Sequence, residues 1–284
     1  MEIFTLWLWP LLALILLPGL LVYFGLHVVE RGIIFVDLAL AQIAALGICV
    51  AIALGSNPGH DVLPFVLSVV FTLLGAALFA WTRFNHPRVP QESIIGIIYV
   101  VAAAAATLAL SHSAEGDEAL KNLLVGNILL VTKKEVLRTF GLFAAIAVLH
   151  GFLRRRFLLI TFDEKRAKAA GISLRLWDFI FYATFGLTVV SFVQITGVYL
   201  VFSYLIVPAV CGALLTAHIR SRLIIGWIVA FAAGVSGLLL SVKLESLDLP
   251  TGPTIVCCFG VLLLVCAAAM KLRNGNRRLS PLPK

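Results

Sequence analysis

Residues 198–217 are VYLVFSYLIVPAVCGALLTA, and none of these side chains carries a charge. An α-helix needs about 20 apolar residues to cross the hydrocarbon core of a bilayer, which is about 30 Å thick. Inside that core every backbone N–H and C=O must be paired within the segment, so a continuous apolar run is typical of a transmembrane helix. The stretch 198–217 therefore predicts a helix that spans a membrane.

The composition of the whole chain extends this prediction to a protein that lies mostly within a membrane. Of its 284 residues, 61% are hydrophobic and 13% are charged, and the mean hydropathy is +1.07. Soluble domains carry roughly 45–50% apolar and about 25% charged residues. These values exclude a soluble enzyme, a disordered regulator and a disulfide-stabilised scaffold. The net charge is +8, but most of the chain is too apolar to face nucleic acid.

Further apolar runs of similar length predict an all-α, polytopic membrane protein with nine spans. Alternating apolar and polar residues would indicate a β-barrel, but these runs are continuous. A tenth run, Leu123–Val131, is too short to cross and is expected to be re-entrant or interfacial. An eight-span alternative leaves the first segment at the membrane surface. The predicted spans are residues 4–26, 33–54, 62–81, 94–111, 139–154, 177–196, 198–217, 222–242 and 254–270.

The distribution of Lys and Arg predicts the orientation of these spans, because short cytoplasmic loops are enriched in both residues. With the N-terminus outside, 17 of the 22 basic residues fall on the inner side and five on the outer side. The reverse orientation would place 17 of them outside. We therefore expect one transmembrane domain over residues 1–284, with an inner loop at 157–176 and a basic inner tail at 271–284.

The predicted inner loop contains a polar segment with signals for a short helix. Asp163 and Glu164 open this segment, basic residues follow, and Gly171 ends it. Acidic residues in the first turn and a glycine after the last turn are typical of a helix start and stop. The segment is either a solvated loop that keeps basic residues inside or a docking helix for a cytoplasmic partner.

Ionisable residues within the spans are the candidates for function. A charged side chain at the centre of a span costs about +2.5 to +3.5 kcal/mol on insertion scales. Asp37 lies a few residues into the second span. Its carboxylate either faces a central pathway, where a hard oxygen ligand suits a divalent cation, or is satisfied by a neighbouring helix. His150, in the fifth span, is expected to be a hydrogen-bonding residue in preference to a metal ligand. Apart from Asp37, the spans are nearly free of acids.

Six segments match, in the right order, the motifs of one transporter family. They are Arg31–Gly47 (RGIIFVDLALAQIAALG), Glu92–Ile97 (ESIIGI), Leu124–Leu129 (LVGNIL), Phe162–Gly171 (FDEKRAKAAG), Gly197–Ala209 (GVYLVFSYLIVPA) and Asp248–Thr254 (DLPTGPT). Together they resemble the membrane permease subunit of metal-type ABC importers, the ABC-3 family, which carries zinc, manganese or iron. The resemblance covers most of the chain.

This resemblance implies a non-catalytic transport subunit in the bacterial inner (cell) membrane. It implies a two-fold homodimer, a cytoplasmic ABC ATPase subunit and an extracytoplasmic metal-binding protein, with alternating access to a central pathway. ATP is then bound by the partner, consistent with the lack of a Gly-x-x-x-x-Gly-Lys-[Ser/Thr] motif in this sequence. No tightly bound cofactor is expected. The similarity to the coupling loop of the family places the ATPase contact at Phe162, Asp163, Glu164, Ala167 and Gly171.

The second span departs from the pattern of the family. Many members carry Asp and His four residues apart, whereas here Gln42 follows Asp37 by five residues and occupies the position expected for His. Five residues turn a helix by about 140° beyond a full circle, so this pair is not expected to chelate a metal. An amide is also a poorer zinc ligand than imidazole. His60, in an outer turn, is a further candidate ligand, with an ordinary turn as the alternative.

Pro208 is the candidate gating residue. A proline inside a helix removes one backbone hydrogen bond and kinks the helix. The helix around it either lines the translocation pathway or packs closely against its neighbours through small residues.

Two other transport functions compete with a metal-ion permease. An ABC permease for a metal chelate, such as a siderophore or a cobalamin-like ligand, keeps the architecture but changes the cargo. A stand-alone ion-coupled carrier would need more than one buried acid. A membrane-embedded enzyme would need paired Asp residues or a His-rich tract at one depth, which we do not find in the spans.

The predicted orientation can be tested by chemical labelling. In a cysteine-free background, Lys165→Cys is expected to react with a membrane-impermeant maleimide only in inside-out vesicles, because the loop that contains it is predicted to be cytoplasmic. Glu115→Cys, in a predicted outer loop, is the control and should react only in right-side-out vesicles. Labelling of Lys165→Cys from the outside would contradict the predicted topology.

Overall fold

The computed structural model describes residues 2–56, 61–83, 89–111, 124–126, 128–243 and 249–279. Within these ranges the regular secondary structure is entirely helical. In chain order the elements are α1 (Glu2–Arg31), α2 (Val36–Ala53), α3 (Leu63–Trp81), α4 (Gln91–Leu110), the short 3₁₀ turn η1 (Ile128–Leu130), α6 (Lys133–Phe162), α7 (Glu164–Ala169), α8 (Leu174–Thr196), α9 (Val198–Leu215), α10 (Ile219–Lys243) and α11 (Thr251–Leu279).

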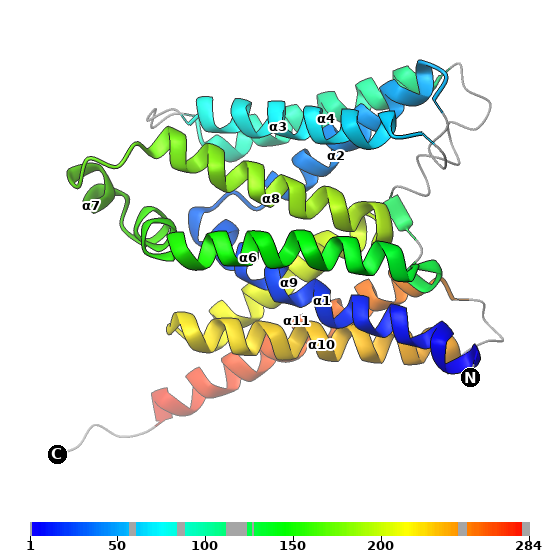
Figure 1. Cartoon of the computed structure of the whole chain (residues 1–284). Coiled ribbons are helices and arrows are strands. Elements are labelled where there is room, and N and C mark those ends of the chain that lie inside the picture. The colour runs from blue at the N-terminus through cyan, green and yellow to red at the C-terminus, as the bar shows by residue number, and fades with distance from the viewer. Residues whose placement is uncertain are drawn as a thin grey trace.

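Nine helices in the described part of the chain are long and apolar enough to cross a membrane. Each corresponds to one of the predicted spans. Helices α3, α6, α8 and α10 lie roughly side by side along one direction, whereas α2 and α9 cross the bundle obliquely (Figure 1). The N-terminus lies at one end of this bundle, whereas α7 and the last turns of α11 lie at the other end. The predicted all-α polytopic fold is therefore confirmed.

Helix α6 is considerably longer than the predicted span 139–154. It begins after Thr132, whose side-chain oxygen accepts a hydrogen bond from the backbone N–H of Glu135 (3.3 Å). The Glu135 carboxylate in turn accepts one from the backbone N–H of Thr132 (2.8 Å), which completes a capping box. At its other end α6 continues through three arginines, which are good helix formers. Within the predicted inner segment 157–176, α6 ends at Phe162 and α8 begins at Leu174, and α7 lies in the connection between them.

Helix α11 also continues beyond its predicted span, 254–270. It ends at Leu279, so the predicted tail 271–284 is helical over the residues that the structure describes. Neither Gly nor Pro stands between Lys271 and Asn274 to end the helix at the membrane surface.

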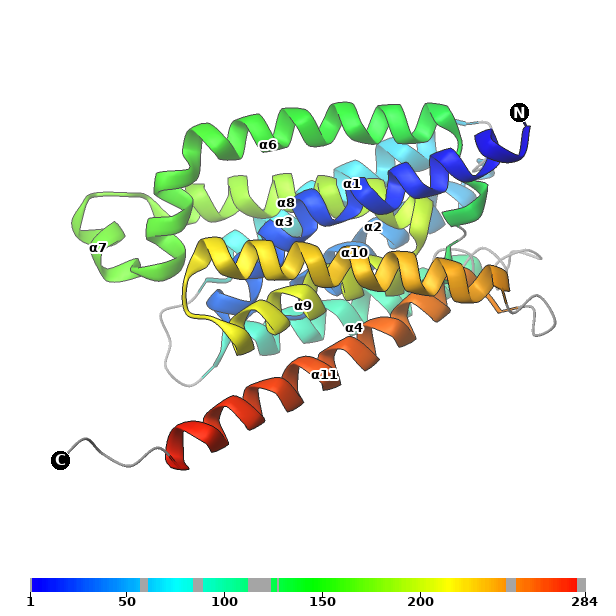
Figure 2. The ribbon, with the colours of Figure 1, turned by 90° about the horizontal axis from the view of Figure 1, so that it is seen from below.

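The membrane-crossing helices form two groups. Helices α2, α3, α4 and α8 pack together as one group, and α1, α9, α10 and α11 form the other. Helix α6 lies on the outside of the bundle, where it contacts α1 of one group and α8 of the other. Figure 2, which shows the molecule from below, places α6 and α11 on opposite sides of the bundle. The contacts of α6 therefore bridge the two groups.

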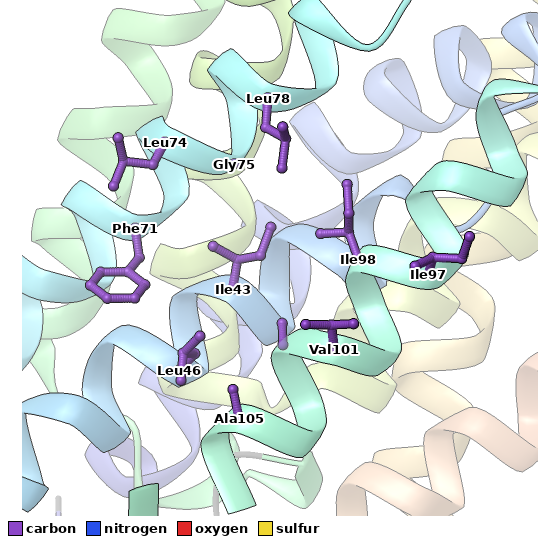
Figure 3. A pocket seen from close by; sticks show the side chains of 11 residues that line it. Ile43, Leu46, Phe71, Leu74, Gly75, Leu78, Ile97, Ile98, Val101 and Ala105 are labelled. Atoms are coloured by element: carbon purple, nitrogen blue, oxygen red, sulfur yellow. The ribbon is translucent and has the colours of Figure 1, made fainter. Parts of the chain in front are cut away.

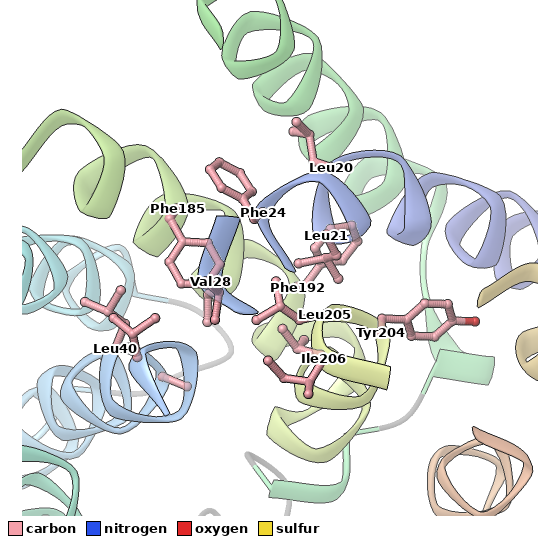
Figure 4. Close-up of a cluster of buried hydrophobic side chains, with 14 of the residues drawn as sticks. Leu20, Leu21, Phe24, Val28, Leu40, Phe185, Phe192, Tyr204, Leu205 and Ile206 are labelled. Carbon is pink, nitrogen blue, oxygen red and sulfur yellow. The ribbon is translucent and has the colours of Figure 1, made fainter. Parts of the chain in front are cut away.

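A core of large apolar side chains fills the space where the two groups meet. Figure 4 shows this core between α1, α2, α8 and α9, with Phe24 and Leu21 of α1 close to Phe185 and Phe192 of α8. Phe24 and Phe185 are fully buried, and their ring centroids lie 5.0 Å apart. Offset aromatic pairs at this distance are stabilising. The interior of the bundle is thus closely packed in this region.

The boundary between α8 and α9 is a single glycine that lies against the segment before η1. Gly197 has a φ of 78°, and Gly126, in the described part of the run Leu123–Val131, has a φ of 62°. A Cβ on Gly197 would lie 2.5 Å from the backbone nitrogen of Gly126. These two motif segments therefore cross backbone to backbone. The described residues of the short run form no membrane-crossing helix, as its length predicted.

Replacing Gly197 with Ala should destabilise the protein. With a φ of 78° and a ψ of 163°, this backbone conformation is essentially confined to glycine and costs another residue on the order of 1–3 kcal/mol. The new Cβ would also overlap the backbone of Gly126. We expect a lower thermal unfolding temperature for the variant in detergent. Gly260→Ala in α11 is the control, because a Cβ there meets no atom within 4 Å. Equal loss of stability in both variants would contradict this account.

Candidate functional site

Asp37 lies in the first turn of α2 and is 2% exposed. Its Oδ1 atom has no hydrogen-bond partner among the described residues. The positive end of the helix dipole favours a carboxylate in this turn, but a buried oxygen without a partner still costs free energy. The alternative in which a neighbouring helix satisfies this oxygen finds no support in the described residues. Asp37 therefore offers an available carboxylate oxygen inside the bundle.

The other predicted ligands do not gather around Asp37. Gln42 lies in the same helix and is 5% exposed, but its position about 140° round the helix turns it away from Asp37. His60 lies outside the described residues. Within the described part of the chain, no three His, Cys, Asp or Glu residues come close enough to hold a metal ion. One protomer therefore supplies Asp37 without a complete ligand set.

Pro208 lies in the interior of α9 and is buried. The helix is closely packed at this point, because a Cβ on Gly226 of α10 would lie 3.2 Å from the carbonyl oxygen of Pro208. On the α1 side, a Cβ on Gly25 would overlap the carbonyl oxygen of Leu205. These contacts favour close packing by small residues around the proline. A gating role for Pro208 remains a prediction.

An apolar cavity of about 320 Å³ lies between α2, α3 and α4. Figure 3 shows Ile43 and Leu46 of α2 facing Phe71 of α3 and Ile98 of α4 across this space. Its lining has no carboxylate, imidazole or thiol that could bind a metal ion. The lining residues are Ile43, Leu46, Phe71, Leu74, Gly75, Leu78, Ile97, Ile98, Val101, Ala102 and Ala105.

The segment predicted to dock a partner forms the short helix α7, which projects between α6 and α8 (Figure 1). Asp163 caps its start, with the carboxylate accepting a hydrogen bond from the backbone N–H of Arg166 (3.0 Å). Gly171 follows its end with a φ of 71°. The predicted start and stop signals are confirmed. Ala167 is fully buried and anchors the helix, whereas Phe162, at the end of α6, is 39% exposed.

A second carboxylate within the spans is Asp178 in α8, which the sequence analysis passed over. Its side chain is fully buried and accepts hydrogen bonds from two guanidinium groups. Arg31, the last residue of α1, binds Oδ1 at 3.0 Å, and Arg83, which follows α3, binds Oδ2. A buried carboxylate bound by two arginines is compensated in charge and in hydrogen bonds. Asp178 is therefore not available as a metal ligand.

Arg83 also binds Glu164 of α7. Its Nη2 atom lies 2.8 Å from Oε2 of Glu164, and Lys168 binds the other carboxylate oxygen at 2.7 Å. Partial burial of Glu164 raises the pKa of its carboxyl, but the hydrogen bond from Lys168 and the charge of Arg83 outweigh this effect and lower it. We refer to Arg31, Asp178, Arg83 and Glu164 as the Asp178 ion chain.

His150 is a hydrogen-bonding residue, as predicted. The Thr184 hydroxyl lies 2.8 Å from Nε2 of His150 and also 2.8 Å from the carbonyl oxygen of Ile180, to which it donates its hydrogen. The other ring nitrogen, Nδ1, lies 3.2 Å from the hydroxyl of Tyr23. Both ring nitrogens of His150 therefore have hydrogen-bond partners, and these contacts link α1, α6 and α8.

Comparisons with known proteins agree with this arrangement. A sequence profile of the ABC 3 transport family matches residues 4–270. The chain is 25% identical over 232 residues to the manganese transport system membrane protein MntC of Halalkalibacterium halodurans, covering 82% of this chain and 76% of that protein. It is 25% identical over 260 residues to the chelated iron transport system membrane protein YfeD of Yersinia pestis, covering 91% and 84%.

A similar fold occurs in the structure of PsaBC from Streptococcus pneumoniae in complex with Fab. The matching chain superposes with a TM-score of 0.76 and 23% sequence identity, covering 94% of this chain and 95% of that one. At this identity the likeness concerns the fold. The profile match reaches from α1 to α11 and includes the whole region of the six sequence motifs. The chain therefore belongs to the ABC 3 transport family and is a multi-pass membrane permease of the metal-type ABC importers.

Proposed function

We propose that this permease imports divalent metal ions across the bacterial inner membrane, driven by a separate ATPase that docks on α7. The observation that carries the proposal is the position of α7, which projects beyond the bundle between α6 and α8 (Figure 1). Its exposed side chains, including Lys165 and Arg166, are available to a partner, whereas Ala167 anchors the helix to the core. A helix that is exposed on one side and fixed on the other suits the transmission of force.

Asp37 is the proposed ligand for the ion along the pathway. Carboxylate oxygen suits manganese, whereas imidazole and thiolate are preferred by zinc. The described residues of α2 include no His, and Gln42 stands where the family resemblance places one. On this ligand chemistry the proposed cargo is manganese in preference to zinc, with iron(II) as the alternative. The name of the manganese relative supports this choice, whereas the relative from Yersinia pestis is named for chelated iron.

The ligand set around the ion requires contributions beyond one protomer. One carboxylate does not hold a divalent ion. Because Asp37 is only 2% exposed in a single protomer, the helices around it would have to part before a second copy, related by a two-fold axis, could add its own Asp37 carboxylate. Water molecules can supply the remaining oxygen ligands of a hard cation. We therefore propose a homodimer that alternates between inward-open and outward-open states around this site.

The cavity within the protomer gives no support to a chelate as cargo, although the proposed pathway lies between two copies. A siderophore or cobalamin-like ligand needs a large site with convergent polar groups. The cavity between α2, α3 and α4 is about 320 Å³ in volume and is lined by apolar side chains. This lining suits neither an ion nor a polar chelate.

Docking on α7 is tested by co-purification of the permease with its ATPase. Asp163→Ala removes the cap of α7, and Gly171→Pro imposes a negative φ where the native value is 71°. Loss of a helix N-cap costs about 0.5–2 kcal/mol, which is large for a six-residue helix. We expect both variants to retain little of the ATPase while they still express and insert.

Asp163→Asn is the matched control for the docking experiment, because Asn caps a helix about as well as Asp. This variant should retain the ATPase. Full retention by Asp163→Ala and Gly171→Pro would contradict the docking role of α7.

Asp37→Ala should abolish metal uptake. In proteoliposomes that contain the permease and its ATPase, with the metal-binding protein added, uptake of manganese and iron(II) is expected to fall at least about tenfold, which corresponds to the loss of about 1.4 kcal/mol of ion stabilisation. Cys49→Ala is the control, because Cys49 is fully buried in the same helix and is not proposed to bind the ion. Unchanged uptake of both ions by Asp37→Ala would remove Asp37 from the pathway.

A further inference from the structure

The Asp178 ion chain joins parts of the molecule that lie far apart in the sequence. Arg31 and Asp178 are separated by 147 residues, and Arg83 and Asp178 by 95. Arg31 ends α1 of one helix group, whereas Arg83 follows α3 and Asp178 lies in α8 of the other group. Glu164 belongs to α7. The carboxylate of Asp178 thus connects the two helix groups. Through Arg83 it is also connected to the proposed docking helix α7.

We propose that Arg83 and Asp178 are positioning residues that transmit movement of α7 to the two groups of membrane helices. This inference rests on the proposed function, in which an ATPase moves α7. Because Arg83 binds Asp178 through Nη1 and Glu164 through Nη2, its guanidinium forms a planar fork between the docking helix and α8. Displacement of α7 therefore pulls on Arg83 directly.

Burial makes this connection stiff. The side chain of Asp178 is 0% exposed, and those of Arg31 and Arg83 are 9% and 17% exposed. Separating either arginine from Asp178 would leave charge uncompensated in a region with little water, which is strongly unfavourable. The Arg31 guanidinium also lies 4.2 Å from the ring centroid of Phe181 in α8. The arginines and Asp178 are therefore expected to move as one unit.

Arg83 cannot be replaced by Lys without losing one of its two contacts. A lysine carries a single ammonium on a flexible stem, whereas arginine presents several donors in a rigid fork. Lys at position 83 could bind Asp178 or Glu164 but would bridge them poorly. The Arg83→Lys variant keeps the positive charge but weakens the bridge between Asp178 and Glu164. Its effect therefore shows whether the bridge or only the charge is required.

A second ion pair in the molecule provides a matched control. Arg222 of α10 binds Glu30 of α1 at 2.7 Å. Both residues belong to the same helix group, and neither is bonded to α7 in the described contacts. Loss of this pair removes a contact of similar length without interrupting the path from α7 to α8.

The experiment measures manganese uptake and ATP hydrolysis in proteoliposomes that contain the complex of permease and ATPase, with the metal-loaded extracytoplasmic binding protein added. The readout is the number of Mn²⁺ ions taken up per ATP hydrolysed. For Arg83→Gln we expect this ratio to fall about fivefold or more, a typical magnitude for coupling between sites, while ATP hydrolysis continues. Arg83→Lys should give an intermediate ratio, and Glu30→Gln should leave it unchanged.

Glu164→Gln keeps the test decisive if Arg83→Gln fails to fold. The side chain of Glu164 is 40% exposed, so its replacement weakens the connection to α7 while the buried pairs of Asp178 remain. A lower ratio for this variant supports the proposal. An unchanged ratio in Glu164→Gln would overturn the proposal. An unchanged ratio in a folded Arg83→Gln complex with reduced thermal stability would also overturn it, because the Asp178 ion chain would then contribute only to stability.

The same measurement separates failure of this inference from failure of the proposed function. If the wild-type complex hydrolyses ATP but takes up neither manganese nor iron(II), the proposed function is wrong and this inference falls with it. If the wild-type complex transports and the variants keep the wild-type ratio, only the role of Arg83 and Asp178 is wrong.

Discussion

Backbone hydrogen bonding in a medium without water is the constraint on which the rest of the structure depends. Each span must satisfy its own N–H and C=O groups, and helices are the form that the described residues take. Irregular backbone is tolerated only where protein surrounds it. The change from α8 to α9 follows this rule, because Gly197 meets the backbone of Gly126 at a distance that leaves no room for a side chain.

Polar side chains inside the bundle follow the same rule. His150 has a partner at each ring nitrogen, and the buried hydroxyls of Thr72 and Thr188 donate to backbone carbonyls one helical turn earlier. Such local pairing makes a polar residue tolerable in an apolar environment. The hydrogen bonds of these side chains therefore stabilise the packing of the helices and leave few of their donors or acceptors free to bind cargo. The candidates for binding cargo are the few buried polar atoms that have no partner among the described residues.

The sequence predicts those features of the fold that depend on neighbouring residues. Apolar runs located the nine spans, and Asp163 with Gly171 located α7. The start of α6 was also encoded locally, by Thr132 and Glu135, but the hydropathy pattern concealed it. By contrast, the role of Asp178 could not be derived from its neighbours, because its partners lie 147 and 95 residues away. An acid within a span, together with arginines at the ends of two others, was the available signal.

The two buried carboxylates, Asp37 and Asp178, differ in their partners, and this difference is the basis of the different roles proposed for them. Asp178 is bound by Arg31 at the end of α1 and by Arg83, which follows α3. Its charge is therefore compensated by residues that hold parts of the bundle together. Asp37 is equally buried, but Oδ1 has no partner among the described residues, and its helix begins without a side-chain cap. A fully compensated acid gains nothing from a cation, whereas an uncompensated one does. The difference in their partners, rather than in their burial, is therefore what points to Asp37 as the ligand and to Asp178 as part of the mechanism that moves the helices around it.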